Sequence, residues 1–190
     1  MISNFIHHSK SILNLKECQN IIDFYESKSE YHKEGTSGEI LDVKNKKCTE
    51  MFVVSSALWN EEEFIPLSLG LTKSINEYKI EYPFINRVQR WGTASTFKIQ
   101  KYLPHEAYFE THCENNGYVD GTVDRRMIAW MCYLNDVTDG GETEFPTQGK
   151  KIAPRAGDVL LWPAYWTHPH HGIPSPSQIK YIVTGWYNYL

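Results

Sequence analysis

The sequence has few cysteines, no long apolar run and no leader-like start, and each of these shortages argues against a class of protein. None of its four cysteines, Cys18, Cys48, Cys113 and Cys132, forms a CxxC pair, which argues against a zinc knuckle or a thioredoxin-like motif. No apolar stretch approaches membrane-spanning length, and the first residues, MISNFIHHSK, do not resemble a signal peptide. We therefore expect a cytoplasmic protein with reduced thiols and no membrane partner.

The chain also lacks a strong charge of either sign and shows no internal repeat. A net charge of -4 gives it no general attraction for phosphate backbones, so we expect no nucleic-acid partner. With 190 residues it is long enough for one domain with a sizeable core and too short for two ordinary ones. Its aromatic richness, with 12 Tyr, 8 Phe and 6 Trp, favours sheet.

The first half of the chain contains the helical patterns. Residues 15–27 place apolar side chains at helical spacing directly after Asn14, a residue that commonly caps helices. Residues 60–82 give a second helical stretch with an apolar face. Between these two stretches, residues 28–49 are polar and predict a loop or weakly paired edge structure, whereas residues 51–55 predict a strand.

From Thr93 onward, short strands alternate with turns. Runs rich in aromatic and β-branched residues occur at 95–103, 126–135, 158–163 and 180–189. Many short strands separated by turn residues predict a sandwich or barrel, which the N-terminal helices would brace on one sheet. The run RMIAWMCYL is apolar on both faces, which predicts a central strand covered on both sides.

The densest candidate for chemistry is the segment His112-Cys113-Glu114. Because side chains two apart in an extended segment point to the same side, His112 and Glu114 could bind one ion together. Residues 168–171, with the sequence HPHH, supply further histidines downstream. Two histidines and one carboxylate form the facial triad of non-haem Fe(II) oxygenases, which leaves positions open for a co-substrate and O2. An HxE match alone is frequent by chance.

Two residues at equal offsets from these histidines add an anchor for a diacid. Tyr102 stands ten residues before His112, and Lys180 stands ten residues after His170. An ammonium group can pair with the distal carboxylate of a diacid, and a tyrosine hydroxyl can donate to the same group. Lys180 and Trp186 fall on one face of the last predicted strand. The sequence thus predicts a metal site together with a carboxylate anchor.

In their order along the chain, these motifs resemble the catalytic jelly roll of prolyl 4-hydroxylase-like 2-oxoglutarate/Fe(II) dioxygenases. The resemblance spans about residues 97–187 and rests on Tyr102, His112 with Glu114, YLND at 133–136, GGET at 140–143, PRAGDVLLWP at 154–163, HHGIP at 170–174, Lys180 and Trp186. It implies an α+β, mainly β fold: a double-stranded β-helix over about residues 91–190, with helical support over about 1–90, in a single domain spanning 1–190.

The resemblance also implies roles for individual residues. Three residues match the iron ligands of the family: His112, Glu114 and His170. Four match residues around the co-substrate. Lys180 matches the basic residue that pairs with the C5 carboxylate of 2-oxoglutarate, and it is counted with the three ligands as catalytic. Tyr102 and Tyr133 match hydroxyl donors, and Trp186 matches an aromatic residue that packs near the site. The family's usual motif is HxD, so Glu114 departs from it by one methylene while offering the same oxygens.

The choice of the second histidine ligand among His168, His170 and His171 depends on strand parity and on analogy with the family. In an extended backbone His171 points to the opposite face from His170, whereas His168 shares the parity of His170. In the family the ligand begins an HxGxP-like segment about ten residues before the basic anchor, as His170 does. We therefore expect His168 at the rim of the site and His171 on the outer face.

The implied function is hydroxylation of a C–H bond, most readily that of a peptidyl proline, with release of succinate and CO2. The implied cofactors are Fe(II), 2-oxoglutarate and O2, with ascorbate as a further candidate. No residue independently demonstrates proline recognition, and residues 115–125 are either a substrate-facing loop or an ordinary connection. The substrate could also be a free amino acid, a nucleobase or another small molecule.

Two other functional classes stay open. One is a non-catalytic jelly-roll binding module that keeps a metal for structure, which would not need Lys180 together with Tyr102. The other is a zinc-dependent hydrolase, against which the lack of an HExxH motif counts. The oligomeric state is not specified by the sequence.

Overall fold

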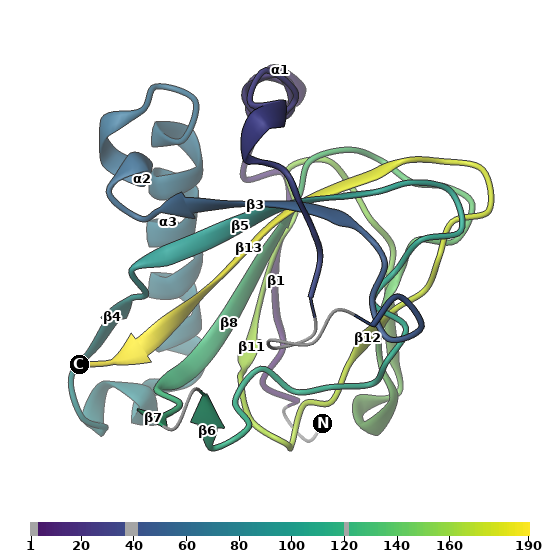
Figure 1. Ribbon diagram of the computed structural model, residues 1–190. Coiled ribbons are helices and arrows are strands. Elements are labelled where there is room, and N and C mark those ends of the chain that lie inside the picture. Colours follow the sequence, from purple (N-terminus) through teal and green to yellow (C-terminus); the bar gives the residue numbers. More distant parts are fainter. Residues whose placement is uncertain (1–3, 37–41, 120–121) are drawn as a thin grey trace.

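A central antiparallel sheet dominates the computed structural model, which describes residues 4–36, 42–119 and 122–190. Its strands run in the order β1 (His7–Ser9), β11 (Val159–Pro163), β8 (Arg126–Tyr133), β13 (Lys180–Tyr189), β5 (Thr96–Tyr102), β3 (Thr49–Val54) and β2 (Lys33–Glu34), and β4 (Trp91–Thr93) pairs with β13 (Figure 1).

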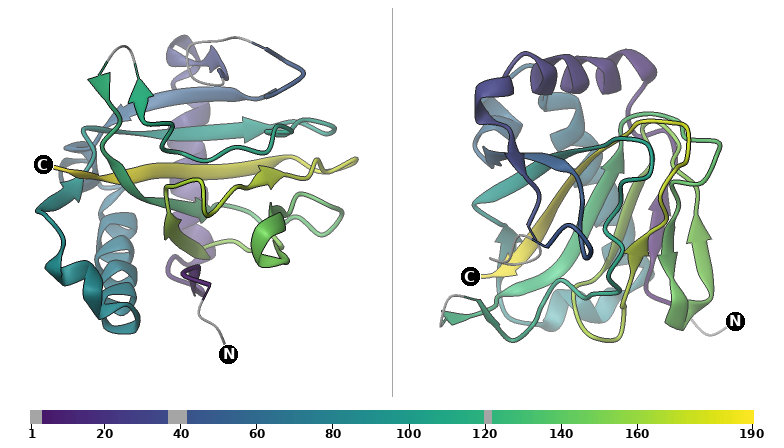
Figure 2. Two further views of the ribbon diagram at one scale, coloured as in Figure 1. Left: turned by 90° about the horizontal axis from the view of Figure 1, so that it is seen from below. Right: turned by 45° about the vertical axis from the view of Figure 1, so that its right-hand side comes forward.

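Two smaller sheets complete the strands. β10 (Lys150–Ile152), β9 (Thr143–Phe145) and β12 (His171–Gly172) form one, which packs Phe145 edge-on against Trp162 of β11 with ring centroids 5.5 Å apart. β6 (Tyr118–Val119) and β7 (Thr122–Val123) form the other, at one end of the molecule (Figure 2). The mainly antiparallel arrangement is the jelly-roll type of fold that was expected.

The central strand β8 explains why the main sheet has two hydrophobic cores. Its alternate side chains enter different clusters because neighbouring residues of a strand point to opposite faces. Ile128, Trp130 and Cys132 pack in the core that includes the helices, and Ala129, Met131 and Tyr133 pack in the core inside the jelly roll. The strand lies between β11 and β13, so the prediction of a central strand covered on both sides is confirmed.

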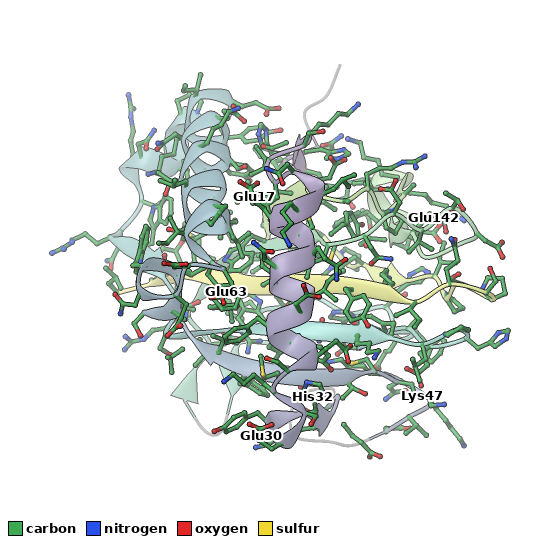
Figure 3. All side chains as sticks on the ribbon, turned by 90° about the horizontal axis from the view of Figure 1, so that it is seen from above. Glu17, Glu30, His32, Lys47, Glu63 and Glu142 are labelled. Carbon is green, nitrogen blue, oxygen red and sulfur yellow. The ribbon has the colours of Figure 1, made fainter. Side chains whose placement is uncertain are left out.

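Helices cover one face of the main sheet. α1 (Leu15–Glu26) crosses the strands (Figure 3), and Asn14 caps it as predicted, since its side chain accepts from the Glu17 amide at 3.0 Å while the Glu17 carboxylate accepts from the Asn14 amide at 2.8 Å. α2 (Ala57–Asn60) and α3 (Ile65–Glu81) follow, with short 3-10 turns η1 (Ser29–Tyr31), η2 (Pro83–Arg87) and η3 (Pro146–Gln148) elsewhere.

Three expectations from the sequence need correction. The helix predicted from residue 60 to residue 82 starts later, at Ile65, because α2 ends at Asn60 and Pro66 suits the first turn of α3. The first ninety residues are not helical support alone, since they contribute β1, β2 and β3 to the main sheet. Residues 115–125 include the β6–β7 pair, with residues 120–121 outside the described part.

Within the described ranges, no helix is both long and apolar enough to cross a membrane. All four cysteine thiols are free.

Gly157→Ala is expected to destabilise the fold strongly. Gly157 has a φ of 81°, its carbonyl accepts from the amide of Ile12 at 2.8 Å, and a Cβ there would lie 2.0 Å from the carbonyl oxygen of Leu13. Left-handed strain costs about 1–2 kcal/mol, and the backbone clash adds to it, so urea unfolding should show a loss above about 2 kcal/mol. Gly149→Ala is the control, because its φ is 60° but nothing lies within 4 Å of its Cβ. Equal losses in both variants would remove the clash from the explanation.

Candidate active site

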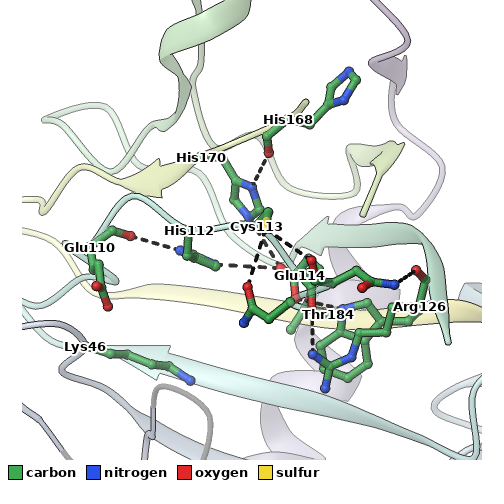
Figure 4. Close-up of polar contacts among 12 residues, drawn as sticks. Lys46, Glu110, His112, Cys113, Glu114, Arg126, His168, His170 and Thr184 are labelled. Carbon is green, nitrogen blue, oxygen red and sulfur yellow. Dashed lines mark hydrogen bonds and ion pairs between the residues drawn. The ribbon is translucent and has the colours of Figure 1, made fainter. Parts of the chain in front are cut away.

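His112, Glu114 and His170 converge on one point inside the jelly roll (Figure 4). One ligand atom from each lies within 4.8 Å of the other two. The Nε2 atoms of His170 and His112 are 3.3 Å and 3.8 Å from Oε1 of Glu114. The structure therefore brings together the three residues that the sequence singled out, from two segments more than fifty residues apart.

A single β-bridge between His112 and His170 fixes this meeting. The His112 amide donates to the His170 carbonyl at 3.0 Å, and the His170 amide donates to the His112 carbonyl at 2.9 Å. Residues that exchange both hydrogen bonds in an antiparallel pair are directly opposed, so their side chains leave the backbone side by side. The two imidazole rings accordingly lie with centroids 4.4 Å apart.

Backbone carbonyls orient both rings. Nδ1 of His112 donates to the carbonyl of Glu110 at 2.9 Å, and Nδ1 of His170 donates to the carbonyl of His168 at 3.0 Å. With the proton on Nδ1, each Nε2 keeps its lone pair for a metal ion, and a partner on the other ring nitrogen is the usual way in which a protein orients a histidine ligand. Burial lowers the pKa of His112 and so favours the neutral imidazole that binds metals.

The Glu114 carboxylate is held from its other side. The indole Nε1 of Trp186 donates to Oε2 of Glu114 at 2.8 Å, which leaves Oε1 facing the histidines. Arg126 stacks its guanidinium 4.2 Å from the centre of the Trp186 ring and donates to the Glu114 carbonyl at 2.8 Å. Burial works to raise the pKa of Glu114, but whenever His112 and His170 are protonated on Nε2 their hydrogen bonds and positive charge outweigh it and lower the pKa well below its usual range.

The neighbouring histidines do not lie where the sequence analysis placed them. His168 was expected at the rim, but it is buried, and its Nε2 lies 2.8 Å from the carbonyl of Asn4, away from the pocket. His171 was expected on the outer face, but it lines the pocket and contacts Glu144, with Nε2 3.3 Å from the carboxylate. The error for His168 arises because residues 165–168 form a turn, so strand parity does not extend to that residue.

Lys180 and Tyr102 lie opposite each other in the β13–β5 pairing. The Lys180 ammonium is buried, lies 4.9 Å from the centre of the Tyr102 ring and donates to the Gly141 carbonyl at 3.0 Å. Burial lowers the pKa of Lys180 to about 8. The Tyr102 hydroxyl donates to Gln100 at 3.2 Å, and burial raises its pKa well above the usual value, so it remains a donor.

Tyr133 lies one layer behind the pocket. Its hydroxyl donates to Oγ1 of Thr143 at 2.7 Å, and Thr143 rather than Tyr133 lines the pocket. Sequence reasoning missed Thr143, Arg126 and Gln100. Gln100 shares the strand parity of Tyr102 and could have been found in that way. Thr143 ends the GGET segment that the sequence analysis quoted without giving this residue a role, and no local pattern marks Arg126.

These side chains share one pocket of about 1020 Å³, which contains the three-residue cluster and extends from Lys180 to Thr96. Two imidazole nitrogens and one carboxylate oxygen on one side of a point are the donor set of non-haem Fe(II) oxygenases. The residues therefore fit an Fe(II) ion, and the buried ammonium of Lys180 fits the far carboxylate of a diacid in the same pocket.

Comparisons with known proteins agree on one family. A family model of the 2OG-Fe(II) oxygenase superfamily matches residues 97–188. A protein of Acanthamoeba polyphaga mimivirus described as "Putative prolyl 4-hydroxylase" is 25% identical over 191 residues, which cover 93% of this chain and 71% of that protein. Prolyl 4-hydroxylase 5 of Arabidopsis thaliana is 30% identical over 117 residues, which cover 47% of this chain and 38% of that protein.

Solved structures share the fold at lower sequence identity. The viral collagen prolyl hydroxylase of Paramecium Bursaria Chlorella virus-1, in its 2OG complex, superposes with a TM-score of 0.75 at 19% identity, covering 98% of this chain and 97% of that one. A prolyl hydroxylase from Trichoplax adhaerens, in complex with a hypoxia inducible factor peptide fragment, gives 0.71 at 18% identity, with coverages of 98% and 84%.

Proposed function

We propose that the chain is a 2OG-Fe(II) oxygenase that hydroxylates a peptidyl proline, and that His112, Glu114 and His170 hold its iron. The observation that carries the proposal is the coexistence, in one pocket, of this donor set and the buried ammonium of Lys180. A metal that served only structure would need no buried cation in the same pocket, which argues against a non-catalytic module.

Bound Fe(II) and 2-oxoglutarate supply the oxidation, in which O2 converts a C–H bond into an alcohol and leaves succinate and CO2. The protein's own residues hold and orient the metal and the co-substrate. Glu114, fixed by Trp186, and the two histidines, fixed by backbone carbonyls, present their donor atoms before metal arrives. Such preorganisation lowers the free-energy cost of assembling the metal centre.

Lys180 would hold the far carboxylate of the co-substrate. Its ammonium is buried and has a carbonyl partner at Gly141, so it retains further donors for an incoming carboxylate. The hydroxyl of Thr143, positioned by Tyr133, lies in the same pocket and offers a second donor. The co-substrate would then be held at both ends, which fixes its orientation relative to the iron.

The peptidyl-proline assignment draws its support from the relatives. The similar proteins are described as prolyl 4-hydroxylases, and one similar structure holds a peptide. The pocket opens past exposed aromatic side chains, Phe52 at 51% and Trp166 at 79% exposure, which offer a stacking surface to a chain such as a proline-rich peptide. A small-molecule substrate would not need to contact these outer rings.

We expect succinate formation that requires Fe(II) and increases with a proline peptide. Purified protein is freed of metal, then assayed with 2-oxoglutarate and ascorbate, with and without Fe(II), against proline peptides and a panel of free amino acids and nucleobases. Hydroxyproline is measured by mass spectrometry alongside succinate. Equal succinate yields from metal-free and iron-loaded protein would overturn the oxygenase assignment, and hydroxylation confined to small molecules would overturn the peptide assignment.

A further inference from the structure

A buried cluster of charged side chains lies on the pocket wall formed by β3 and β5. Glu50 is at its centre and is 1% exposed. Three side chains donate to its carboxylate: Lys46 at 2.6 Å, Lys98 at 3.0 Å and Gln100 at 2.9 Å. Burial works to raise the pKa of Glu50, but the charges of Lys46 and Lys98 outweigh it and lower the pKa, so the carboxylate stays ionised.

This cluster carries one positive charge in excess, because two ammonium groups share one carboxylate and Gln100 is neutral. Lys46 is buried and also donates to the Thr36 carbonyl at 3.1 Å. Within the described part of the chain, Lys98 makes a single hydrogen bond, to Glu50, and its ammonium lies 4.5 Å from the centre of the Phe52 ring. Lys98 lines the pocket, so its remaining donors are available to a ligand there.

The other charges around the pocket balance without this cluster. The charges of Fe(II), Glu114, doubly negative 2-oxoglutarate and Lys180 cancel one another. The Arg126 guanidinium forms an ion pair with the Asp124 carboxylate at 3.7 Å. Glu110 also lines the pocket but is exposed, so water and salt screen its charge. The excess positive charge beside Lys98 therefore has no fixed counterpart among these groups.

Lys98 lies apart from the co-substrate anchor. It shares the pocket-facing side of β5 with Tyr102 and pairs in register with Thr184 of β13, whereas Tyr102 pairs with Lys180. Four residues along a strand correspond to roughly 13 Å, so one small diacid cannot occupy both positions. The Glu114 charge still acts on Lys98, which places Lys98 within electrostatic reach of the metal-binding cluster.

We propose that Lys98 is a specificity-determining residue that selects acidic peptides, those with an Asp or Glu side chain close to the hydroxylated residue. The inference rests on the proposed function, since it describes the substrate of the same pocket. A substrate carboxylate would supply the negative charge that the cluster lacks and would accept a hydrogen bond from the Lys98 ammonium.

The test compares two synthetic peptides that are identical except that the residues flanking a central proline are Glu in one and Gln in the other. For the unmodified protein, kcat/KM should be about tenfold higher for the Glu peptide, the lower end expected of a charge-assisted hydrogen bond, and the ratio should shrink as salt is added. Lys98→Gln keeps an N–H that can donate to Glu50 and should bring the ratio close to one. Lys101→Gln is the matched control, because Lys101 lies on the outer face of the same strand and pairs with Glu26 at 2.8 Å.

Binding of fluorescently labelled versions of both peptides is measured beside turnover, so that two failures can be told apart. Equal kcat/KM values and equal affinities for the two peptides would overturn the role of Lys98 while leaving the proposed function intact. An unchanged ratio in Lys98→Gln, with both rates lowered together, would make the cluster purely structural and would also overturn it. Lys98-dependent binding of the Glu peptide without hydroxylation would support the acidic subsite and overturn the proposed function.

Discussion

His170→Ala should abolish both iron binding and succinate formation. Its Nε2 lies 3.3 Å from Glu114 Oε1, its ring is oriented by a backbone carbonyl, and the residue is 5% exposed. Removing one of three protein ligands leaves only His112 and Glu114, and the co-substrate cannot then be oriented at a stable centre. Iron content by metal analysis and succinate yield at saturating 2-oxoglutarate measure the two losses.

The neighbouring histidines provide the controls for this experiment. His171→Ala removes a contact with Glu144 at the pocket wall, and His168→Ala removes a hydrogen bond to the Asn4 carbonyl. Both variants should bind iron at the normal ratio, and His168→Ala should show its effect in thermal stability because that residue is buried. A His170→Ala protein that retained iron and turnover would show that another histidine is the ligand.

The sequence predicted the fold well wherever periodicity was strong. The four strands β5, β8, β11 and β13 were all expected, since each buries a long alternating or continuous apolar run. β1, β9, β10 and β12 were not, because strands of two or three residues carry too little periodicity to be distinguished from loop. Their pairing depends on long-range contacts, which no local pattern records.

The residues of the candidate site were also predicted only in part. Residue spacing predicted that His112 and Glu114 share one side, the family resemblance added His170, and the structure brings the three together. The sequence could not predict that Trp186 donates to the Glu114 carboxylate, because that contact joins β13 to a loop residue 72 positions away and depends on a side-chain rotamer. The Lys46–Glu50–Lys98 cluster was also missed, since a lysine-rich turn on its own predicts a solvated loop.

Lys180→Met should weaken 2-oxoglutarate binding by roughly one to two decades while iron binding stays largely intact. The substitution keeps an apolar stem but removes a buried ammonium whose charge-assisted hydrogen bond to a carboxylate contributes about 1.5–3 kcal/mol. Lys180 pairs with Tyr102 across β5 and β13 and is not one of the three clustered metal-binding residues, so the donors of the iron site should be unaffected. Titrating 2-oxoglutarate and Fe(II) separately against the variant measures both effects, and an unchanged 2-oxoglutarate affinity would remove Lys180 from the site.

The pH dependence of the same binding step should reveal the burial of Lys180. Burial lowers the pKa of its ammonium to about 8 in the unliganded protein, and only the charged form attracts a carboxylate. Below about pH 8 the proton is already in place and the affinity should change little. Above it, binding must also take up a proton, so the affinity should fall by up to about tenfold per pH unit. Lys180→Met has no such proton to lose. Its weaker affinity for 2-oxoglutarate should therefore stay constant from roughly pH 7.5 to 9.5, the range in which the affinity of the unmodified protein falls. Parallel declines in the two proteins would assign the pH dependence to the metal centre and not to this lysine.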